Sequence, residues 1–111
     1  MNRALGLIGL CARAGKIQSG EQACELAVKR GQACLILLDG AASQNTRKAF
    51  EDACAYHSIP IRQTDAEALG EAIGKPGRRI AAVLDGKLAQ KLADMLPEPD
   101  ETKDPALIHN D

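Results

Sequence analysis

Residues 16–31, KIQSGEQACELAVKRG, predict a short polar strand that breaks at Ser19-Gly20 and continues directly into an amphipathic helix. A glycine at such a junction lets the backbone of a partner approach closely, and the first turn of a helix directs unpaired N–H groups outward. Helix starts of this kind attract phosphates and other anions. The stretch therefore favours phosphate or nucleic-acid binding over covalent chemistry.

Outward from this stretch, helices alternate with short apolar strands. The predicted helices cover residues 3–14, 20–30, 44–57, 66–73 and 86–96, and the predicted strands cover residues 33–38, 59–62 and 80–84. Ser43 and Asp85 are the expected N-caps of the third and last helices, since their side chains can accept from the first turn. This alternation predicts an α/β domain of three layers, with helices on both faces of a small, largely parallel sheet.

Helical spacing also predicts which residues form the core. In the second helix these are Ala23, Cys24, Leu26, Ala27 and Val28, in the third Thr46, Phe50, Ala53, Cys54 and His57, and in the last Leu88, Leu92, Met95 and Leu96.

Length and charge indicate one globular domain with an acidic end. The chain has 111 residues, of which 45% are apolar and 26% charged. Its formal net charge is −1, but residues 97–111 carry −4, which leaves +3 on residues 1–96. We expect residues 1–96 to fold as the domain and residues 97–111 to form an acidic, proline-rich disordered tail. The sequence contains no membrane-length apolar run and no signal-peptide cleavage site, which predicts a cytoplasmic protein.

The sequence offers little for catalysis or for a cofactor. The four cysteines form no CxxC pair, and neither HExxH nor a serine nucleophile elbow is present. The segment 70–75, GEAIGK, follows no strand and lacks the Ser/Thr of a P-loop. Asp39 and Asp85 both end strands and could hold a magnesium ion for phosphoryl transfer, but capping aspartates are the more common case. We therefore expect no catalytic residue, no metal and no cofactor.

Basic loops and scarce aromatic residues narrow the possible modes of RNA binding. Phe50 and Tyr56 are the only aromatic residues, so a surface that stacks several bases is excluded. Recognition would have to use helix starts and loops, with charge from Lys16, Lys75, Arg78 and Arg79. Arg47 and Lys48 are weaker candidates, because Glu51 and Asp52 follow four residues later and can pair with them.

Four ordered motifs resemble a known family. They are LGLIGLCARAGKIQSGEQA, CLILLDGAASQNTRKAF, YHSIPI and LGEAIGKPGRRIAAVLD, and the resemblance covers about residues 4–96. Their order and spacing are similar to the kink-turn-binding ribosomal-protein superfamily, in particular its bacterial YlxQ-like branch. The resemblance implies an α/β/α sandwich around a four-stranded mixed sheet, without enzymatic activity. It also implies binding of kink-turns, which are bent RNA helices with sheared G·A pairs, or association with ribosomes and translation.

The resemblance further implies which surfaces meet RNA. The start of the second helix would enter the groove beside the G·A pairs, and the loop before the last strand would cover an extruded base. The loop after the first long strand would flank that base. The implied contacts are Ser19, Gly20, Glu21 and Gln22, then residues 42–46 from Ala42 to Thr46, and then residues 75–79, which include Lys75, Pro76, Arg78 and Arg79.

In the second predicted helix, this chain departs from the pattern of the superfamily that it resembles. Where archaeal and eukaryotic relatives commonly carry Asn-Glu and a later lysine, it has Gln22, Ala23 and Leu26. Losing a charge-assisted contact costs on the order of 1.5–3 kcal/mol, or tenfold or more in affinity. Two interpretations follow: a monomeric RNA-binding protein that recognises structured RNA, with ribosomal RNA or ribosomal subunits as possible partners, or a protein-interaction module that has kept the scaffold and lost RNA affinity.

Overall fold

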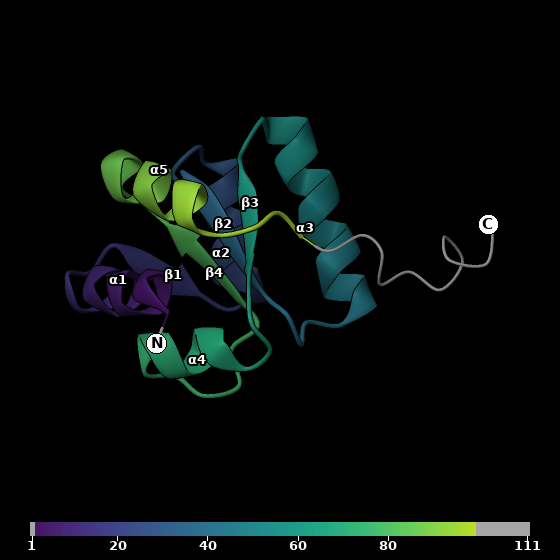
Figure 1. The fold of residues 1–111 in the computed structure, drawn as a ribbon. Coiled ribbons are helices and arrows are strands. Elements are labelled where there is room, and N and C mark those ends of the chain that lie inside the picture. Colours follow the sequence, from purple (N-terminus) through teal and green to yellow (C-terminus); the bar gives the residue numbers. More distant parts are fainter. Residues whose placement is uncertain (1, 100–111) are drawn as a thin grey trace.

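The computed structural model describes residues 2–99 (Figure 1), so residues 100–111 of the predicted acidic tail lie outside the described residues. Along the chain the elements are α1 (Arg3–Arg13), β1 (Ile17–Ser19), α2 (Glu21–Lys29), β2 (Leu35–Asp39), α3 (Gln44–His57), β3 (Ile61–Thr64), α4 (Ala68–Ile73), β4 (Ile80–Val83) and α5 (Gly86–Met95). The predicted α/β class and the four-stranded mixed sheet are confirmed.

The four strands form one sheet in the order β1-β4-β2-β3. β2 and β3 are parallel, whereas β4 lies antiparallel to both β1 and β2, with Leu35 opposite Val83 and Leu38 opposite Ile80. The prediction of a largely parallel sheet, made from the residues alone, was therefore wrong. Helices cover both faces of this sheet, so its central strands are apolar on both sides whichever way they run, and their composition does not reveal direction.

Two apolar cores lie on opposite faces of the sheet. Alternate residues of each central strand point to opposite faces, as the pleat requires. Leu35, Leu37, Ala81 and Val83 pack under α1, α4 and α5, whereas Ile36, Leu38, Ile80 and Ala82 pack under α2 and α3 (Figure 1). This arrangement gives the three layers that the sequence predicted.

Three residues predicted in the core are exposed instead. Leu26 on α2 is 47% exposed and Met95 on α5 is 40% exposed, while His57 ends α3 in solvent. Each lies at the border of its apolar stripe, where periodicity alone cannot distinguish a core position from a flanking one. The prediction of a buried Thr46 is confirmed.

The observed N-caps of α3 and α5 are the residues that the sequence predicted. Ser43 Oγ accepts from the Thr46 N–H at 3.2 Å, and Asp85 Oδ2 accepts from the Leu88 N–H at 3.0 Å.

After α5, the Pro97 carbonyl accepts from the Gln63 N–H at 2.9 Å and so joins the edge strand β3. Ordered chain thus continues past residue 96. No helix within residues 2–99 is long and apolar enough to span a membrane.

Candidate nucleic-acid interface

The junction between β1 and α2 leaves a helix start open. Gly20 is the N-cap of α2, with φ of 97° and no side chain to accept from the first turn. Its own N–H donates to the Ile80 carbonyl at 3.0 Å, which fixes the junction against β4. Glu21 and Gln22, the next two residues, are exposed. The first turn of α2 therefore faces solvent with its N–H groups available to an anion.

Arg78 joins this junction to the loop before β4. Its Nη1 donates to the Ser19 carbonyl at 2.9 Å and to Ser19 Oγ at 3.0 Å. A Cβ on Gly20 would lie 2.7 Å from the same nitrogen. The residue at position 20 must therefore combine a positive φ with the absence of a side chain, which only glycine does without strain.

The starts of α2 and α3 are joined by side chains. The Thr46 hydroxyl donates to the Glu21 carboxylate, and the Ser43 hydroxyl donates to Thr46 Oγ1 at 3.1 Å. Ser43 thus serves both as the N-cap of α3 and as part of a bridge between two helix starts. The carboxylate of Glu21 also lies in the first turn of α2, where the helix dipole favours negative charge.

Asp39 organises the loops at the end of β2. The residue is fully buried, and its carboxylate accepts from the N–H groups of Ala41 at 2.8 Å, Glu67 at 2.7 Å and Leu69 at 3.0 Å. Arg79 Nη1 lies 3.7 Å from Asp39 Oδ2, and the Arg79 side chain is 35% exposed. One carboxylate therefore fixes the loop after β2, the start of α4 and the loop before β4.

These contacts bring together three of the segments predicted to form the site. We call residues 19–22, 42–46 and 75–79 the three-loop surface. Within it Lys75, Pro76 and Gly77 are exposed and Ala42 is half-buried. Arg78 and Arg79 are both held by internal partners, which the sequence did not predict.

Lys16 does not join this surface. Its carbonyl accepts from the Leu84 N–H at 2.9 Å, and Leu84 follows the carboxyl end of β4. Ser19, at the other end of β1, pairs with Ala81 near the start of β4. Lys16 therefore lies at the opposite end of the sheet, so the structure separates it from the other predicted site residues.

Comparison with known proteins places the chain in a family. Residues 3–93 match the Ribosomal protein L7Ae/L30e/S12e/Gadd45 family. The chain belongs to this family. It is 40% identical over 91 residues to a Bacillus subtilis (strain 168) protein called RNA-binding protein YlxQ, a match that covers 81% of this chain and 91% of the relative. An Enterococcus faecium protein of the same name is 32% identical over 95 residues, covering 85% and 91%.

Solved structures agree with this L7Ae-family fold. A protein described as having unknown function, from Bacillus halodurans C, superposes with a TM-score of 0.82 at 35% identity, covering 86% of this chain and 97% of that one. A Giardia lamblia 15.5kD RNA binding protein superposes with a TM-score of 0.69 at 20% identity, covering 83% and 82%. The second likeness concerns the fold alone.

Two alternative roles of the charged residues are not supported by this L7Ae-family structure. Because β2 and β4 are antiparallel, Asp39 and Asp85 lie at opposite ends of the sheet and cannot share a magnesium ion. Among residues 2–99, no group of three or more metal-ligating side chains is found. Lys48 pairs with Asp52 at 3.4 Å as predicted, whereas Arg47 is buried and donates to Gln63 Oε1 at 2.7 Å instead of pairing with Glu51.

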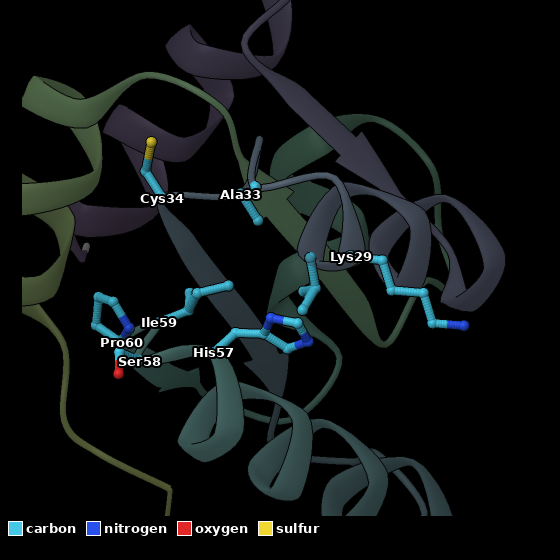
Figure 2. A pocket seen from close by; sticks show the side chains of 9 residues that line it. Lys29, Ala33, Cys34, His57, Ser58, Ile59 and Pro60 are labelled. Carbon is cyan, nitrogen blue, oxygen red and sulfur yellow. The ribbon is translucent and has the colours of Figure 1, made fainter.

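A pocket of about 340 Å³ lies at the end of the sheet opposite the three-loop surface (Figure 2). It is lined by the ends of α2 and α3 and by the residues that precede β2 and β3. Figure 2 shows that the Lys29 amine and the Cys34 sulfur point away from the His57 imidazole. The pocket therefore does not assemble a set of catalytic or metal-binding groups.

Proposed function

We propose that this protein is a non-enzymatic RNA-binding protein that recognises structured RNA through the three-loop surface. The observation that carries the proposal is the set of contacts that fix its loops: Arg78 with Ser19, Thr46 with Glu21, and Arg79 with Asp39 at the end of β2. A surface whose loops are already fixed loses little entropy on binding. The names of two close relatives, RNA-binding protein YlxQ, support RNA as the ligand.

The surface suits RNA backbone and splayed bases better than stacked single strands. The open start of α2 offers N–H groups to a phosphate, and the Gln22 amide can hydrogen-bond a base edge. Exposed Lys75 supplies positive charge beside them. Tyr56, the more exposed of the two aromatic residues, lies near the far end of α3. This arrangement supports a bent, kink-turn-like RNA helix as the ligand.

We further propose that the protein acts in the cytoplasm as a monomer, associated with ribosomal RNA or ribosomal subunits. The family name, which groups ribosomal proteins, supports this association. Residues 1–96 would form the binding domain and residues 97–111 the acidic tail, which is joined to β3 at its first residue because the Pro97 carbonyl accepts from Gln63.

The test is a titration of the full chain against a short kink-turn RNA, with a control RNA whose G·A pairs are converted to Watson–Crick pairs. Preference for the first RNA supports the proposal, and the affinity should fall as salt is raised because phosphates are neutralised. Equal, weak binding to both would contradict specific recognition.

A matched pair of lysine variants locates the site. Lys75→Ala removes a charge from the three-loop surface, whereas Lys29→Ala removes one from the far end of α2. We expect the first variant to weaken binding severalfold and to reduce its salt dependence, with the second unchanged. Equal losses in both variants would indicate non-specific attraction to RNA.

A second candidate function rests on α2. Leu26 is 47% exposed and half-buried Ala23 lies one turn before it, beside the three-loop surface. An exposed apolar side chain there suits a protein partner better than a phosphate. Capture of a ribosomal protein that survives nuclease treatment, and is lost in Leu26→Lys, would favour this function over RNA binding.

A further inference from the structure

An open groove of about 540 Å³ lies between α1 and α5, on the face of the sheet opposite α2 and α3. Its apolar lining consists of Leu7, Leu10 and Met95, of which Leu10 is 55% exposed and Met95 40% exposed. Large apolar side chains gathered along one groove lose contact with water when a partner covers them.

Three cations line the same groove: Arg3, Arg13 and Lys91. Within residues 2–99, the ion pairs are Lys48 with Asp52 and Arg79 with Asp39, so none of the three is paired. An apolar strip bordered by unpaired cations is complementary to a segment that carries apolar side chains between carboxylates.

We propose that residues 100–111 of this chain dock in the groove between α1 and α5. Leu107 and Ile108 would cover Leu10 and Met95, and the acidic side chains of the segment would pair with the cations at the rim. Those acidic side chains are Asp100, Glu101, Asp104 and Asp111, against the single cation Lys103. Both the apolar and the charged parts of the groove thus have counterparts in one segment of the chain.

The attachment of this segment makes the contact possible. The chain leaves α5 at Met95, which itself lines the groove, and Pro97 is fixed by its bond to Gln63. Leu107 lies ten positions after Pro97, a distance of roughly 33–36 Å when the chain is extended. At 1.5 Å per residue, α1 is only about 16 Å long. A tethered segment has an effective concentration on the order of millimolar, so modest contacts are enough to hold it.

Docking of this segment is independent of RNA binding. The groove lies on the α1 and α5 side of the sheet, whereas two of the three loops of the surface proposed for RNA lead into α2 and α3. The proposal therefore stands or falls separately from the proposed function.

The test uses methyl NMR of the full chain with labelled leucine and methionine. Leu107→Asp/Ile108→Asp should shift the resonances of Leu10 and Met95 and leave Leu26, an exposed leucine on the other face, unchanged. Lys91→Glu should reproduce the shifts at Leu10 and Met95. Lys87→Glu, one turn earlier on α5 and outside the groove lining, should not.

Three results would overturn the proposal. Unchanged Leu10 and Met95 resonances would leave the groove empty. A shift at Leu26 instead would place the segment on the three-loop side. Shifts at Leu10 and Met95 that disappear on dilution would show that a second copy of the chain covers the groove.

Discussion

Asp39 is fully buried, and its carboxylate accepts three backbone N–H groups while it also pairs with Arg79. A buried carboxylate that accepts several hydrogen bonds holds the donating groups in place. When its charge is removed, those donors lose a charged acceptor and the hydrogen bonds become weaker. The residue that sequence analysis weighed as a metal ligand is therefore the structural centre of the loops around it.

Asp39→Asn should destabilise the protein by about 2–4 kcal/mol, because the amide replaces an accepting oxygen with a donor facing other N–H groups. Urea unfolding measures this loss. Asp85→Asn is the matched control, since Asp85 makes one cap bond, to Leu88, and asparagine caps helices nearly as well. Equal effects of the two substitutions would contradict the central role of Asp39.

The cysteines differ in their surroundings. Burial raises the pKa of Cys24 and of Cys54 from the ordinary value of 9.0 to about 12, and it also raises the pKa of Cys11. Cys34 is only half-buried. Alkylation requires the thiolate and access to it. In the native protein at mildly alkaline pH, we expect iodoacetamide to modify Cys34 first, as measured by intact mass, and Cys34→Ala to remove this early step.

The raised pKa values of Cys24 and Cys54 make the free energy of unfolding depend on pH. A raised pKa means that the folded state favours the neutral thiol. The contribution of Cys24 and Cys54 is therefore fully present below pH 9 and is lost as the pH rises toward 12. The free energy of unfolding should fall across this range. Rapid alkylation of all four cysteines at mildly alkaline pH would show that the buried thiols are accessible and contradict this account.

For some single residues, burial and contact partners could not be predicted from the sequence. Leu26 and Met95 fit the helical spacing of a core position, yet both are largely exposed, because periodicity gives the direction of a stripe but not its width. Arg47 was expected to pair along its helix with Glu51, but it is buried against Gln63. That contact joins residues 16 positions apart, which no local pattern reveals.

At the scale of elements, the packing of helix α4 against the loop that follows it depends on the close approach of the loop backbone to Gly70. A Cβ on Gly70 would lie 2.7 Å from the Lys75 carbonyl oxygen, 2.9 Å from the Gly77 nitrogen and 3.0 Å from the Arg78 nitrogen. All three are backbone atoms, which cannot move aside as a flexible side chain does. Gly70 thus allows the loop of residues 75–79 to fold back on α4.

Gly70→Ala should therefore destabilise the protein by roughly 1–3 kcal/mol and weaken RNA binding as the loop is displaced. Gly6→Ala on α1 is the matched control, because nothing lies within 4 Å of the added Cβ, and alanine there should stabilise by about 0.5–1 kcal/mol. Thermal unfolding and RNA titration of both variants measure the two effects. If Gly70→Ala is as stable as the original protein and binds RNA with full affinity, the loop of residues 75–79 does not require glycine at position 70.

The helices were predictable because their ends carry local signals. Ser43 and Asp85 cap α3 and α5 through side chains within three residues, so the helix bounds followed from composition. The directions of the strands could not be predicted in the same way. Pairing between β2 and β4 links residues more than forty positions apart, and apolar strands covered on both faces look alike in either direction.

At the scale of the whole molecule, the antiparallel pairing of β4 decides which loops meet. The start of β4 lies beside the end of β2, so Arg79 reaches Asp39 while Arg78 reaches Ser19. The same pairing sends Lys16 and Asp85 to the opposite end. The motifs of the family pointed to the three loops in the sequence, but only the topology explains why Lys16 is not among them.

This topology predicts that two cations of one loop act differently. Lys75 is exposed, so Lys75→Ala should lower RNA affinity and leave the free energy of unfolding unchanged. Arg78 makes two hydrogen bonds to Ser19, so Arg78→Ala should lower stability by about 1–2 kcal/mol and RNA affinity as well. Arg78→Lys separates charge from geometry, because it keeps the charge on a shorter side chain without the planar fork. If Arg78→Lys restores affinity but not stability, charge is what RNA requires there. If Arg78→Lys restores neither affinity nor stability, RNA binding requires the junction at Gly20 to be held by the Arg78 hydrogen bonds. Full affinity in Arg78→Ala would show that RNA binding requires neither the charge nor the hydrogen bonds of Arg78.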